Sequence, residues 1–171
     1  MTDVLDSAIR ILSTTVGRWQ SLVETAPEEL LRRAPTAGEW SAADCLNHLL
    51  LTERVVFGSR LRAILEGRDL ITFDPSAQQH PDAARTLQEV AMALAAERGD
   101  NLAVLSSLTP ADMERSSRHP EYGRVALGVM LNTWAAHDLQ HTVQAEEALM
   151  QEFIPGTGPF RFRFADHDVR K

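Results

Sequence analysis

The chain has 171 residues, of which 44% are hydrophobic and 24% are charged, a balance typical of one globular domain with a continuous core. Its formal net charge is −7 and it has no clustered basic stretch, so we expect neither nucleic acid nor an anionic membrane as a partner. It has one cysteine, no signal-like N-terminus and no apolar run of about 18 residues, so we expect a cytoplasmic protein without an internal disulfide.

The first predicted helix spans about residues 3–26. Its apolar residues recur at three- and four-residue steps, which places them in one stripe along the segment, and Pro27 ends the helix. The stripe consists of Leu5, Ala8, Ile9, Leu12, Val16, Trp19, Leu22 and Val23.

The second predicted helix begins after Ser41 and runs to about Glu66, before Gly67. Ser41 can cap its N-terminus, and Asp44 stands three residues on, where a capping box places an acidic or amide side chain. Apolar residues cover much of the circumference of this segment, so we expect it to be the most buried helix.

The third predicted helix starts near Pro81 and ends at Thr109, and the fourth spans about residues 125–151. About 14 to 15 residues separate each helix from the next, where bundles typically use about 2 to 8. Such long connections allow a crossover between helices. The sequence therefore predicts an all-α fold, a four-helix bundle over residues 1–152.

Residues 153–171 form a tail with an alternating apolar and basic run, Phe160 to Phe164. Alternation is typical of a short strand, and it also suits an arm that packs on the bundle or on a partner subunit.

His137 and His141 are four residues apart on the fourth helix, so their rings project from one face, about a turn apart, and can reach one metal ion. This face should point into the bundle. A buried imidazole without a partner costs about 1 to 3 kcal/mol, and a shared ion is one way to avoid that cost. The residues that share the face are Ala126, Met130, Trp134 and Ala148.

Two alternatives stay open on spacing alone. The pair can be ordinary core histidines, each hydrogen-bonded to a neighbour, and spacing singles out no third ligand. A metallopeptidase is disfavoured, because Asp138 stands where the HExxH motif has its glutamate base, and no downstream glutamate suits a third ligand. The remaining histidines that could complete a site are His48, His80, His119 and His167.

Several blocks of the sequence resemble the DinB-like family, metal-binding four-helix bundles that include YfiT-like proteins described as hydrolases and thiol S-transferases. The block from Trp134 to His141, with Gln144, is the most specific. The other matching residues are Glu39-Trp40-Ser41, His48, Phe73-Asp74-Pro75, Arg98 to Leu108, His119-Pro120 and Gly123.

The resemblance implies that His48, His137 and His141 bind one divalent metal ion, with zinc, nickel or iron as candidates. It implies water in the remaining coordination positions, which is the open arrangement of a catalytic site. It also implies a helix order with a long crossover and, frequently, a homodimer.

Two functions follow as hypotheses: a metal-dependent enzyme with a small-molecule substrate, either a hydrolase or a thiol S-transferase, or a non-catalytic regulatory bundle stabilised by metal. Other side chains are secondary candidates for a role at the metal site. Asp44 can orient His48 or cap its helix, and Cys45 can be a fourth ligand or a small core residue. The side chains that can line a pocket are Trp40, Trp134, Asp74 and His80, the last two in the loop over residues 67–80.

Overall fold

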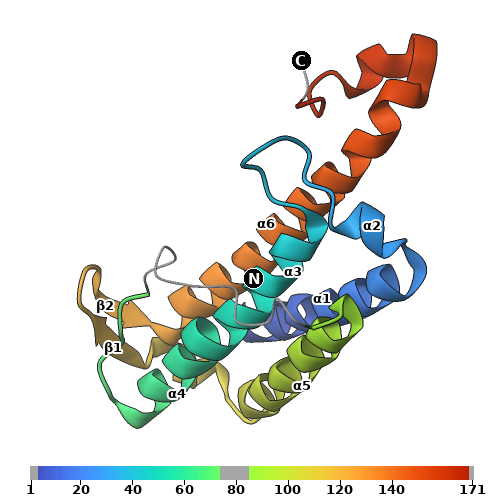
Figure 1. Cartoon of the computed structure of the whole chain (residues 1–171). Helices are drawn as coiled ribbons and strands as arrows, with labels where there is room; N and C mark the ends of the chain where they lie inside the picture. Colours follow the sequence, from blue (N-terminus) through green and yellow to red (C-terminus); the bar gives the residue numbers. More distant parts are fainter. Residues whose placement is uncertain (1–3, 74–84, 170–171) are drawn as a thin grey trace.

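The computed structural model describes residues 4–73 and 85–169, and this part of the chain contains four long helical segments. Figure 1 shows how they are arranged. Helix α1 packs against α5 and α6, and α3 packs against the same two helices. Consecutive segments α1 and α3 therefore lie diagonally across the bundle, which explains the long connection between them. The predicted four-helix bundle is confirmed. The segments are α1 (Val4–Thr25), α3 (Ala42–Thr52) continued by η1 (Glu53–Phe57) and α4 (Gly58–Glu66), α5 (Leu87–Ser106), and α6 (Leu127–Phe153).

Two of the long helices, α3 and α5, begin at capping boxes. The Asp44 backbone N–H donates to Ser41 Oγ at 3.2 Å, and the Ser41 N–H donates to Asp44 Oδ2 at 2.9 Å, as the sequence predicted. Thr86 and Glu89 form the same arrangement at the start of α5. The prediction began this helix near Pro81, which lies outside the described residues, whereas α5 begins at Leu87 after the extended Thr86 cap.

A π-helical turn, η1, interrupts the second segment. One extra residue in such a turn rotates the following part of the helix by about 100° relative to an unbroken α-helix. Glu53 and Phe57, the first and last residues of η1, are both buried. The shift explains why apolar residues occupy much of this helix's circumference, because different faces point inward before and after the turn.

A two-stranded hairpin between α5 and α6 was not predicted. Strand β1 (Ser116–His119) pairs antiparallel with β2 (Gly123–Ala126), and His119 stands opposite Gly123. Gly123 has φ +72°, a conformation that favours glycine. The hairpin lies at one end of the bundle (Figure 1). Two short helical segments lie between the long ones: α2 (Glu28–Leu31) and the 3₁₀ segment η3 (Pro110–Glu114).

The tail forms 3₁₀ turns, η4 (Ile154–Phe164), and not the short strand that alternation suggested. Gln151 fastens the chain end to α6: its amide donates to the His167 carbonyl at 2.7 Å and accepts from the Val169 N–H at 3.1 Å. The division into a bundle of residues 1–152 and a tail of residues 153–171 stays a prediction. None of the described helices combines the length and the apolar character needed to cross a bilayer.

Candidate metal centre

Three histidine rings from two helices converge between α3 and α6. His48 Nε2 lies 3.1 Å from His137 Nε2, and one nitrogen of each ring lies within 4.8 Å of those of the other two, His141 included. No cysteine or carboxylate of the described residues joins this group. Of the four histidines that spacing left open as a third partner, the structure brings His48 to the pair.

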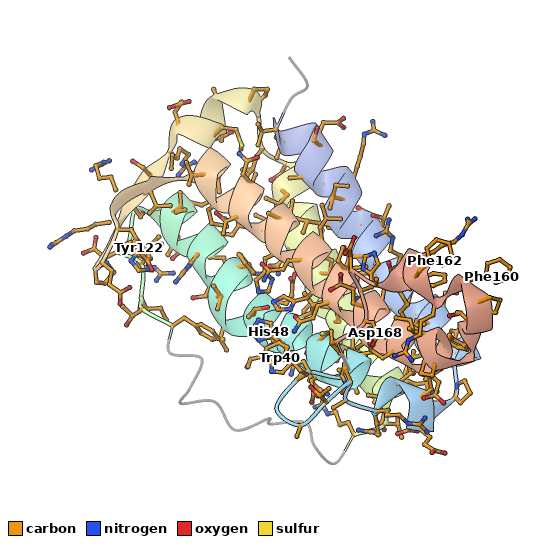
Figure 2. The ribbon with its side chains drawn as sticks, turned by 90° about the horizontal axis from the view of Figure 1, so that it is seen from above. Trp40, His48, Tyr122, Phe160, Phe162 and Asp168 are labelled. Atoms are coloured by element: carbon orange, nitrogen blue, oxygen red, sulfur yellow. The ribbon has the colours of Figure 1, made fainter. Side chains whose placement is uncertain are left out.

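The rings of Trp40 and Phe57 contact the three histidines. Trp40, just before the cap of α3, stacks on His141 with ring centroids 5.5 Å apart and lies 4.9 Å from His48 (Figure 2). Phe57 meets His137 edge-on at 5.1 Å. Trp134, also predicted to line a pocket, is fully buried and stacks on Phe57. Trp40 is therefore the tryptophan that contacts the histidine rings.

Gln144 fixes the orientation of His141. Its Oε1 lies 2.9 Å from His141 Nδ1, and because an amide oxygen can only accept, Nδ1 carries the hydrogen. The lone pair of His141 is therefore on Nε2, the atom available to a metal ion. Burial lowers the pKa of His141, with Gln144 acting in the opposite direction, so the neutral ring is favoured.

His137 is also held neutral. Burial, followed by the neighbouring His141 and His48 and then Arg98, lowers the pKa of His137 to about 3. Its Nδ1 is buried without a hydrogen-bond partner among the described residues. Two nitrogens that bind one zinc tetrahedrally lie about 3.3 Å apart, close to the separation of His48 and His137 Nε2. Three imidazoles with converging nitrogens, two of them favoured in the neutral form, thus fit a divalent ion.

A fully buried ionic network lies against the turn of α6 that carries the histidines. Arg98 Nε and Nη2 donate to the two oxygens of Glu53, and Nη1 and Nη2 donate to Asp138. The second Nη1 hydrogen goes to the Leu12 carbonyl at 2.7 Å, so all five N–H groups of Arg98 are used. The side-chain amide of Asn101 and the indole N–H of Trp134 also donate hydrogen bonds to Glu53.

This network anchors the helix beside the site. Asp138 follows His137 directly, and its carboxylate pairs with Arg98 rather than joining the three histidines. Burial lowers the pKa of Arg98, but hydrogen bonds and charges from Glu53 and Asp138 outweigh burial and raise it above its ordinary value. The pairing of Arg98 with Glu53 was not predicted from the sequence. One signal was present, since Arg98 continues the apolar stripe of α5 four residues after Leu94.

The other candidates lie apart from the three rings or outside the described residues. Asp44 caps α3, and Cys45 is buried in the core. His119 is buried in β1, and His167 Nδ1 pairs with Glu147 at 3.4 Å. Asp74 and His80, predicted to line a pocket, lie outside the residues that the structure describes.

We expect Cys45 to be unreactive in the folded protein. Burial, with a smaller effect of Asp44, raises the pKa of its thiol to about 12, and only the thiolate attacks disulfide reagents. A disulfide dye at pH 8 should label the native chain slowly and should label one thiol per chain at once in denaturant. Rapid labelling of the folded protein would contradict this burial, and Cys45→Ser provides the blank.

A family model described as the DinB superfamily matches residues 11–145. Among solved structures, the chain is similar to YfiT from Bacillus subtilis, described as "a probable metal-dependent hydrolase with an unusual four-helix bundle topology", with 19% identity, 89% of each chain covered and a TM-score of 0.76. It is also similar to TT2238, described as a four-helix bundle protein, with 21% identity, 82% of this chain and 98% of that chain covered, and a TM-score of 0.59. No curated protein sequence matches the chain.

Proposed function

Because this chain belongs to the DinB superfamily, we propose that His48, His137 and His141 hold one divalent metal ion and that this centre hydrolyses a small-molecule substrate. The observation that carries the proposal is the convergence of three imidazole nitrogens, from α3 and α6, within 4.8 Å of one another. The description of YfiT as a probable metal-dependent hydrolase supports the same class of function for a chain of similar fold.

Three protein ligands leave coordination positions open, as is typical of catalytic rather than structural sites. A divalent ion at this position supplies a Lewis acid that promotes nucleophilic attack at neutral pH. The chain's own residues orient the site: Gln144 holds His141 with Nε2 free, and Trp40 covers the rings of His141 and His48. Since no described carboxylate joins the three histidines, a side-chain general base is not part of the proposal.

Hydrolysis of p-nitrophenyl acetate by protein purified without a histidine tag and loaded with zinc, nickel or ferrous iron tests this proposal. We expect turnover to disappear on chelation and to fall by about a hundredfold or more in His141→Ala, because the remaining ligands no longer hold the ion. The matched control is His167→Ala, which removes a histidine on the tail and should leave turnover unchanged.

Two results would assign the centre differently. If p-nitrophenyl acetate is not turned over while chelation lowers the melting temperature, the metal is structural and the protein is a metal-stabilised binding or regulatory bundle. If turnover needs both a low-molecular-weight thiol and an electrophilic acceptor, the centre is an S-transferase. The identity of the ion, a homodimeric state and a cytoplasmic location stay predictions.

A further inference from the structure

A cavity of about 230 Å³ lies between the hairpin, α4 and the first half of α6. Phe57, Leu70 and Met130 contribute to its largely apolar wall, and Arg60, His119 and Tyr122 are its main polar residues. Figure 2 shows Tyr122 on the hairpin at one end of the molecule, with His48 and Trp40 nearer the middle. The cavity is thus distinct from the three-histidine site, although Phe57 contributes a wall to both.

Arg60 and His119 bring two hydrogen-bond donors together in this cavity. The Glu121 backbone N–H donates to His119 Nδ1 at 3.2 Å, so the hydrogen of the neutral ring lies on Nε2. His119 Nε2 lies 3.2 Å from Arg60 Nη2, which can only donate. Two donors do not satisfy each other, whereas the oxygens of one anion can accept from both.

The charge of Arg60 is poorly compensated. Its contact with the Ile71 carbonyl is long, at 3.4 Å, and it forms no ion pair with a carboxylate in the described part of the chain. Burial lowers the pKa of Arg60, while Tyr122 and Glu121 oppose that effect. A half-buried guanidinium beside a histidine that is 3% exposed therefore favours an incoming negative charge.

We propose that this cavity binds a small organic acid, whose carboxylate accepts hydrogen bonds from Arg60 and His119. The apolar wall suits an organic body rather than an inorganic ion, and the volume lies below the roughly 300 to 1,000 Å³ of drug-sized pockets. The ring of Tyr122, which is 75% exposed, lies 4.7 Å from that of His119 and stands where it can cover the carboxylate.

The single tyrosine of the chain reports directly on this cavity. In protein labelled on the tyrosine ring and freed of metal, we expect the NMR signals of Tyr122 to shift as sodium benzoate is added. Benzamide has the same shape without the charge, and it should bind at least about tenfold more weakly. Arg60→Gln should weaken benzoate binding by a similar factor, and His119→Phe should also weaken it.

The matched control is Arg124→Gln, which removes an exposed arginine of the same hairpin and should leave benzoate binding unchanged. Tyr122 signals that do not move with benzoate, or that move equally with benzamide, would overturn the proposal even if a variant failed to fold. Because the titration uses metal-free protein, its outcome does not depend on the proposed hydrolase function, and esterase activity without benzoate binding would refute this site alone.

Discussion

Replacing Arg98 by methionine is expected to lower the free energy of unfolding by about 3 to 5 kcal/mol, measured by urea denaturation of metal-free protein. The guanidinium is fully buried, and so are its partners Glu53 and Asp138. Removing it leaves two carboxylates without their cation, in a place where water cannot replace the lost hydrogen bonds. The decrease in the free energy of unfolding should therefore exceed that caused by an ordinary core substitution of similar volume.

Arg10→Met is the matched control, because Arg10 pairs with Asp6 on the surface, where the side chains are 75% and 54% exposed. An exposed pair of this kind contributes about 0 to 1 kcal/mol. Adding Glu53→Gln and Asp138→Asn to Arg98→Met should recover part of the lost stability, since the triple variant buries no unpaired charge. An Arg98→Met protein as stable as the Arg10→Met protein would show that the network does not anchor α6.

Replacing any one of His48, His137 or His141 by alanine is expected to weaken zinc binding by about a hundredfold or more, measured by competition with a chelator. Four-ligand zinc sites bind with about 10 to 16 kcal/mol, so one ligand accounts for several kcal/mol. Gln144→Leu should weaken binding less, by about 10- to 100-fold, because it removes the acceptor that orients His141 but leaves all three ligands in place.

His167→Ala again provides the comparison, since it leaves the three rings untouched. Should His48→Ala bind zinc as tightly as the unaltered chain while His141→Ala does not, the ion would be held by α6 alone. The contribution of α3 to the centre would then be disproved.

The sequence predicted the helices with clear stripes because burial of one face imposes the three- and four-residue spacing that periodicity detects. Helices α1 and α6 end within about two residues of their predicted bounds. The hairpin was missed because each strand has four residues, too few for a pattern of alternation. The π-turn was missed because its inserted residue is recognised from hydrogen bonding and not from composition.

The candidate site was predictable in part. The helical repeat places His137 and His141 on one face, whatever the rest of the fold, but no local rule states which distant segment that face meets. His48 therefore came from the family resemblance alone. The partners of Arg98 and Glu53 were beyond sequence reasoning for the same reason, since their contacts join residues far apart in the chain.

The most direct test of the metal centre is elemental analysis of protein purified without a histidine tag and incubated with zinc, nickel or ferrous iron before dialysis. We expect close to one ion per chain in the unaltered protein and close to none in a variant with His48, His137 and His141 all replaced by alanine. A metal content no higher in the unaltered protein than in that folded triple variant would contradict the account.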